Sequence, residues 1–326
     1  MKSKQKTNTI LFLIIGILTI NMLLPNSLAE EESIEIVCTN SVLADFTSNI
    51  ITENVSIDYI MPAGACPAHF DTSPSDVSKI VNADIIISLG WEPWLETLLN
   101  KSGNTDFTEI KCPGLGEWNI PTGALSYVQT ITAGLLTALP EKSTAIRENS
   151  NSYQSVINET AETLKNNIIN QNFTERKVVC MEWQKDFLEW IGLNVTYYYP
   201  PPESLSVQDE LDVVSAASQN DVAAVIDNLQ SGTAFGARVA SESGVSHVIF
   251  SNFPGAIPNT DTYVEMITYN TDQLIKGITS FDYTTDQTRE LQSELGSVSL
   301  QRNAFAMTTV FALIVCMILF VMYRKK

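Results

Sequence analysis

A histidine in a glycine- and proline-rich loop is the residue of this sequence best suited to bind a metal ion. The loop reads PAGACPAHFDTSP over residues 62–74 and contains both Cys66 and His69. A neutral imidazole is a good ligand for zinc or manganese, and a thiolate favours zinc or copper(I). The chain has only two histidines, the second being His247, which disfavours a multi-histidine metal cage or a histidine-based catalytic triad.

Common enzymatic signatures are absent from the sequence. It has no Gly-x-Ser-x-Gly elbow, P-loop, HExxH or CxxC motif. The net charge is −18, from 19 basic and 37 acidic residues, whereas binding of nucleic acid needs a basic face. We therefore expect a binding protein that is not an enzyme and has no nucleic-acid partner.

Both ends of the chain are apolar and indicate export to a membrane. Residues 1–29 combine three lysines, a short apolar run and a small-residue cleavage site, which predicts a secretory signal peptide. Residues 304–323 carry no charge and are followed by Arg-Lys-Lys, which predicts a transmembrane helix with a cytoplasmic end. We expect a single-pass protein of the cell membrane with an extracellular ectodomain. Five N-x-[ST] sequons predict a glycoprotein, at Asn54, Asn100, Asn158, Asn172 and Asn194.

Strand-like and helical segments alternate in two parts of the chain. Apolar runs such as residues 84–89 are typical of strands buried on both faces of a parallel sheet, and the alternation indicates an α/β fold. Between the two parts, residues 140–170 have helical spacing, which predicts a stiff linking helix of roughly 45 Å. The predicted strands cover residues 34–38, 55–61, 84–89, 177–180, 195–199, 221–226 and 247–250.

Two stretches near the start of the ectodomain resemble a known family. VCTNSVLADFTSNI and MPAGACPAHFDTSPSDVSKIVNADIIISLGWEPWLETLL are similar to the cluster A-I solute-binding proteins of ABC importers, the zinc and manganese type. The resemblance runs over about residues 34–278 and implies two Rossmann-like lobes joined by a long rigid helix. The positions that carry the match are Gly64, Pro67, His69, Phe70, Ser73, Pro74, Ser75, Asp76, Ala83, Asp84, Trp94 and Leu95.

With this resemblance, the chain divides into six parts. They are a signal peptide (1–29), an N-terminal α/β lobe (30–139), the linking helix (140–170), a C-terminal α/β lobe (171–280), a stalk (281–303) and the transmembrane helix (304–323).

The resemblance implies four metal ligands in the cleft between the lobes. The first is His69, within the best-matched motif. The family's second ligand, a histidine, falls on Gly116, so the adjacent Glu117 is the predicted substitute. The third falls on Met181 or Glu182, of which Glu182 is the better donor, and the acidic fourth is replaced by Asn252. Asp227 and Asn228 follow a strand and are further cleft candidates.

The donor set does not fix the metal. Carboxylate and amide oxygens favour manganese-like hard ions, whereas Cys66, Cys112 and Cys180 lie next to the predicted ligands and their thiolates favour soft metals. Cys66 and Cys112 are alternatively a disulfide, or the cysteines are free buried thiols.

The resemblance implies a monomeric protein that captures a divalent ion, zinc or manganese, and delivers it to an ABC permease and its ATPase. Two alternatives remain open. The same fold binds a chelated metal or a small organic ligand, or the protein is a surface adhesion protein with a degenerate metal site.

Overall fold

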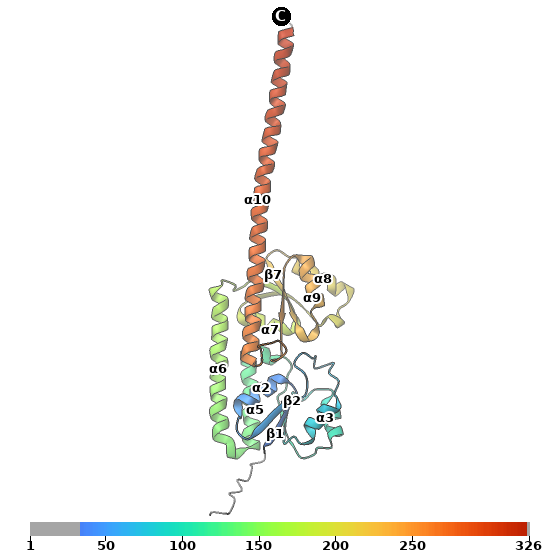
Figure 1. Cartoon of the computed structure of the whole chain (residues 1–326), viewed down its shortest axis with the longest axis vertical. Helices are drawn as coiled ribbons and strands as arrows, with labels where there is room; N and C mark the ends of the chain where they lie inside the picture. The colour runs from blue at the N-terminus through green and yellow to red at the C-terminus, as the bar shows by residue number, and fades with distance from the viewer. Residues whose placement is uncertain (1–32, 325–326) are drawn as a thin grey trace, which may run out of the picture.

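The computed structural model describes residues 33–324 and contains two α/β lobes of the same design (Figure 1). Each lobe has a four-stranded parallel sheet, in the order β2-β1-β3-β4 in the first lobe and β6-β5-β7-β8 in the second. The first lobe contains β1 (Ile34–Cys38), α2 (Ser41–Ile50), β2 (Val55–Tyr59), α3 (Pro74–Val81), β3 (Ile85–Ser88), α4 (Leu95–Ser102), β4 (Thr108–Lys111), the 3-10 turn η1 (Glu117–Asn119) and α5 (Pro121–Ala138).

The second lobe repeats the strand–helix alternation, and the expected α/β architecture is confirmed. One of its two inner strands, β7, is buried along its whole length, as is the inner strand β3 in the first lobe, because helices cover both faces of each sheet. The second lobe contains β5 (Lys177–Met181), α7 (Glu182–Ile191), β6 (Asn194–Tyr199), α8 (Val207–Ala217), β7 (Val222–Asn228), the 3-10 turn η4 (Leu229–Ser231), α9 (Ala234–Ser243) and β8 (Ser246–Phe250).

A single long helix links the lobes, as the sequence predicts. Helix α6 (Ser143–Asn170) has 28 residues, about 42 Å at 1.5 Å per residue. It packs against α2 and α5 of the first lobe and against α7 of the second, and in Figure 1 it runs along the side of both lobes. A short 3-10 turn, Pro140–Lys142, precedes it.

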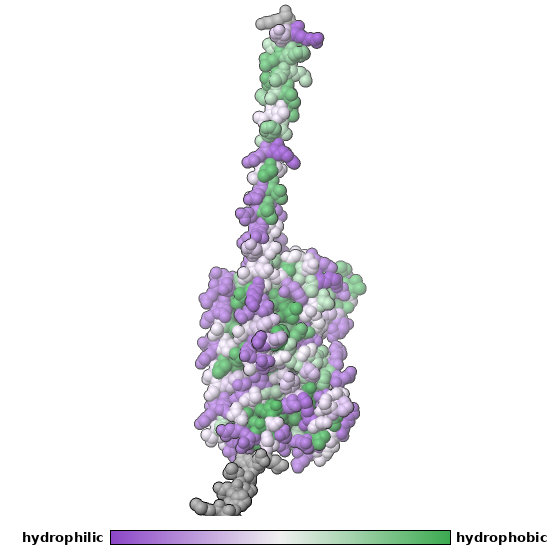
Figure 2. Space-filling view, viewed as in Figure 1, coloured by the Kyte–Doolittle hydropathy of each residue, from purple (hydrophilic) through white to green (hydrophobic). Residues whose placement is uncertain are grey.

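The last helix, α10 (Tyr263–Arg324), is continuous over 62 residues. Its first turns bury Tyr263, Ile267 and Leu274 against the body, whereas residues 304–323 are exposed all round. This part is apolar and projects from the body as an isolated rod (Figures 1 and 2). By length and composition it is able to cross a membrane. The predicted stalk is thus a helical extension of the second lobe, and the predicted signal peptide lies outside the described residues.

A buried carboxylate joins three helices near the point where the lobes meet. Asp45 on α2 accepts hydrogen bonds from the Tyr153 hydroxyl of α6 at 2.8 Å and from the Tyr263 backbone N–H of α10 at 3.1 Å, and Asn49 donates to its other oxygen. Burial outweighs these bonds and raises the pKa of Asp45 to about 6, with a smaller contribution from the charge of Glu265.

This carboxylate predicts a specific pH dependence of stability. The pKa of Asp45 is higher in the folded than in the unfolded chain. Between about pH 4 and pH 6 its carboxyl group is therefore protonated in the folded state and ionised in the unfolded state. The contribution of Asp45 to the free energy of unfolding is therefore full below about pH 4 and falls by up to about 3 kcal/mol as pH rises to 6. In the Asp45→Asn variant this fall should be missing. Calorimetric unfolding of both proteins from pH 4 to 7 checks this, and parallel curves would contradict it.

Candidate functional site

A cavity of about 150 Å³ lies between the two lobes. Its walls come from loops that follow β2, β3 and β4 in the first lobe and from the segments at the ends of β5 to β8 in the second. The carboxyl ends of parallel strands in α/β folds are the usual place for a ligand. The lining residues are Cys66, Pro67, Ala68, His69, Trp91, Leu115, Gly116, Trp118, Trp183, Pro201, Glu203, Asn228, Gln230, Ser231, Asn252 and Phe253.

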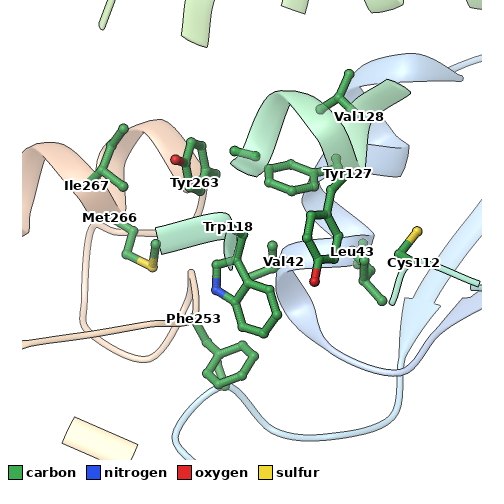
Figure 3. Close-up of a cluster of buried hydrophobic side chains, with 14 of the residues drawn as sticks. Val42, Leu43, Cys112, Trp118, Tyr127, Val128, Phe253, Tyr263, Met266 and Ile267 are labelled. Atoms are coloured by element: carbon green, nitrogen blue, oxygen red, sulfur yellow. The ribbon is translucent and has the colours of Figure 1, made fainter. Parts of the chain in front are cut away.

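Four lining residues carry aromatic rings, Trp91, Trp118, Trp183 and Phe253, and Trp118 is the most deeply buried of them. Its indole N–H donates to the Asn252 carbonyl of the opposite lobe at 2.8 Å. Its ring meets Tyr127 edge-on, with the centroids 5.7 Å apart, and Phe253 at 5.5 Å (Figure 3). Trp118 therefore belongs both to the core and to the contact between the lobes.

Further hydrogen bonds tie the two lobes together around the cavity. The Gln230 amide donates to the Ala63 carbonyl at 2.9 Å, and the Asn119 amide donates to the Trp183 carbonyl at 3.1 Å. The Ser41 hydroxyl donates to the carbonyl of Pro254 at 2.8 Å. These bonds hold the lobes close together, so the cavity is small.

Two of the four predicted ligands line the cavity. His69 is exposed on a turn in which its backbone N–H donates to the Cys66 carbonyl at 3.1 Å, and both side chains reach the cavity wall. Asn252 follows β8 and is buried. Its amide oxygen accepts a hydrogen bond from Gln184 at 2.9 Å, so this oxygen already has a partner.

The other two predicted ligands lie outside the lining. The Glu117 carboxylate lies against Gly114 and accepts a hydrogen bond of 3.4 Å from Tyr127. Glu182 begins α7, where partial burial raises its pKa. Among residues 33–324, no three His, Cys, Asp or Glu side chains lie close enough together to hold a metal ion. In this structure the predicted ligands therefore do not form a complete metal-binding site.

Gly116 fills the place where the family resemblance implies a histidine. Its φ is +90°, a value that side chains rarely adopt. A Cβ atom there would lie 3.4 Å from the Asn119 amide and 3.9 Å from the Trp183 ring. At the position where the resemblance implies a histidine, this chain thus has no side chain, and the indole ring of Trp183 lies beside it.

Asn228 is the polar residue placed most deeply in the wall. It is 1% exposed at the end of β7, and its amide oxygen accepts from the Ser231 backbone N–H at 2.9 Å. Its amide nitrogen is buried without a hydrogen-bond partner. The sequence predicts both Asp227 and Asn228 as cleft candidates, but Asp227 is absent from the lining because it bonds the Tyr199 hydroxyl at 2.6 Å and the His247 ring at 2.7 Å.

The cysteines are free thiols in the structure. Burial raises the pKa of Cys38 and of Cys112 to about 12 and that of Cys180 further, so all three are protonated at neutral pH. The alternative of a Cys66–Cys112 disulfide is therefore not borne out, and Cys66 is the one cysteine on the cavity wall.

The interlobe cavity, the twin parallel sheets and the linking helix together define a two-lobed solute-binding protein. The family model described as "Zinc-uptake complex component A periplasmic" matches residues 36–277, and the chain belongs to this family. The manganese-binding lipoprotein MntA of Halalkalibacterium halodurans is 24% identical over 271 residues, which cover 76% of this chain and 89% of that protein. The metal ABC transporter substrate-binding lipoprotein SsaB of Streptococcus sanguinis is 30% identical over 94 residues, 26% of this chain and 30% of that protein.

Solved structures share the same fold. A manganese-bound periplasmic metal binding protein from Candidatus Liberibacter asiaticus superposes with a TM-score of 0.64 at 17% identity, over 74% of this chain and 98% of that one. A crystal structure of ZnuA gives a TM-score of 0.64 at 16% identity, over 76% and 99% of the two chains.

Proposed function

We propose that the protein is the extracellular substrate-binding component of an ABC importer and captures a divalent metal ion, of the zinc or manganese class, between its lobes. The family match over residues 36–277 is the observation that carries this proposal. The names of relatives point the same way, since they include manganese- and iron-transport lipoproteins. The protein passes its cargo to a permease and ATPase as a monomer and catalyses no reaction.

We propose His69 as the principal protein ligand. It combines an imidazole, exposure to solvent and a place on the cavity wall. Asn252 lies on the same wall, and Glu117 and Glu182 begin the helical turns next to the lining residues Gly116 and Trp183. The set His69, Glu117, Glu182 and Asn252 is the predicted ligand set, in which the two carboxylates turn toward the cavity when the ion arrives.

We also propose that residues 304–323 of α10 span the membrane and that residues 281–303 form the stalk. Exposed apolar side chains cover this end of the helix on every side, which suits lipid and not water. A continuous helix from the second lobe into the bilayer holds the body at a fixed distance from the permease. A signal peptide at residues 1–29 accounts for the external location of both lobes.

Metal binding should raise the thermal stability of the whole chain. A ligand that binds only the folded state at a concentration of about 100 times its Kd adds about 2.7 kcal/mol to the free energy of unfolding. We expect Zn²⁺ or Mn²⁺ to raise the melting temperature of metal-stripped protein in detergent, and Mg²⁺, which keeps its water shell, to serve as the inactive control. Absence of a shift with any transition metal, added alone or together with a small carboxylate chelator, would contradict the proposal and favour the adhesion alternative.

A further inference from the structure

We propose that the cleft receives its ion as a complex with a small, ring-bearing carboxylate chelator of the pyridine-carboxylate kind. This inference rests on the proposed function and specifies the form of the cargo. The ring would lie in the aromatic cavity, a carboxylate oxygen would accept the free N–H of Asn228, and His69 would bind the ion at the rim.

The cavity wall suits an organic ring better than a hydrated ion. Trp118, Trp183 and Phe253 face it together with Leu115, and its surface is mostly apolar. A bare divalent cation gains nothing from such a wall, because it needs oxygen, nitrogen or sulfur donors. An apolar cavity of about 150 Å³ has the size to hold a single six-membered ring.

The polar groups of the wall also fit a chelate. An amide N–H repels a cation and binds an acceptor oxygen, so the buried, unpartnered nitrogen of Asn228 calls for an anionic or carbonyl oxygen on the ligand. The fixed amide oxygen, held by the Ser231 N–H, keeps that nitrogen in place. Among the described residues that line the cavity, Asn228 is the only one with a buried side-chain nitrogen or oxygen that has no hydrogen-bond partner.

The charge of the wall favours a metal complex over a free organic anion. No lysine or arginine occurs among the described lining residues, and Glu203 brings a carboxylate. As the lobes stand, the wall supplies few metal ligands, because among residues 33–324 no third His, Cys, Asp or Glu lies close enough to His69 and Cys66 to complete a metal site. A bidentate chelator supplies the missing donors and neutralises part of the charge of the ion.

Calorimetric titration of the full chain in detergent, stripped of metal, tests this inference. The probes are zinc chloride, a one-to-one mixture of zinc and picolinate, a one-to-one mixture of zinc and glycinate, and picolinate alone. Glycinate offers the same nitrogen and oxygen donors as picolinate without the ring. We expect zinc–picolinate to bind at least about ten times more tightly than zinc or zinc–glycinate, and picolinate alone to bind weakly.

Two variants separate the ring and carboxylate contacts from the metal contact. Asn228→Asp keeps an oxygen for the Ser231 N–H and replaces the unpartnered N–H by a second oxygen. It should weaken zinc–picolinate binding by about tenfold, the loss expected for one hydrogen bond to a charged group, and should leave zinc binding at least as strong. Trp183→Ala removes a ring from the same wall and should weaken zinc–picolinate binding by a larger factor than zinc binding.

The outcomes distinguish this inference from the proposed function. If zinc alone binds as tightly as zinc–picolinate and Asn228→Asp strengthens both, the inference is wrong and the proposed function stands. If picolinate binds equally well with and without zinc, and zinc does not bind, both are wrong and the protein carries an organic ligand.

Discussion

Replacing Trp118 by alanine is expected to lower the free energy of unfolding by about 3–5 kcal/mol. The side chain is 1% exposed and touches Tyr127 and Phe253, so its loss leaves a cavity where the two lobes meet. The variant also removes the 2.8 Å hydrogen bond to the Asn252 carbonyl, which then lies buried without this donor. Chemical unfolding of the full chain in detergent, followed by near-ultraviolet circular dichroism, measures the effect.

Trp91 provides a matched control for this substitution. It lines the same cavity but is 37% exposed, and its indole N–H donates to the Gly114 carbonyl at the surface. Trp91→Ala should therefore cost only about 1 kcal/mol. Trp118→Phe, which keeps a ring in place and loses only the N–H, should fall between the two. Equal costs for Trp118→Ala and Trp91→Ala would contradict a core role for Trp118.

The inner strands of both lobes were predictable because strands buried on both faces have uninterrupted apolar sequences. Residues 85–87 and 222–226 are apolar without a break, as strands covered on both faces require. Strand β4, with the sequence TEIK, was missed, since it lies at a sheet edge and buries only Ile110. Its place depends on pairing with β3, which no local pattern reveals.

The candidate site was predictable only where its residues belong to one contiguous motif. His69 stands within the loop that carries the family resemblance, and it lies on the cavity wall. The directions of the Glu117 and Glu182 side chains depend on tertiary contacts, such as the hydrogen bond from Tyr127, that spacing does not encode. Trp183 is not among the site residues predicted from the sequence, but it lines the cavity because α7 begins at the cleft.

The His69→Ala variant should lose metal binding by a factor on the order of 100 or more, with little change in stability. Even outer-shell partners of metal ligands are worth about 10–100-fold in affinity, and His69 is the one imidazole on the cavity wall. The residue lies exposed on a turn, so the substitution should change the free energy of unfolding by no more than about 0.5 kcal/mol. Calorimetric titration with Zn²⁺ and with Mn²⁺, beside thermal unfolding without metal, measures both quantities.

The second histidine should behave in the opposite way. His247 on β8 is absent from the cavity lining, and its ring is 2.7 Å from a carboxylate oxygen of the fully buried Asp227. His247→Ala should therefore leave the Kd for metal unchanged and lower the free energy of unfolding by about 1–3 kcal/mol, because Asp227 loses a partner in the core. Unchanged metal affinity in His69→Ala, or a loss of affinity in a stably folded His247→Ala, would show that the ion binds elsewhere than at the rim of the interlobe cavity.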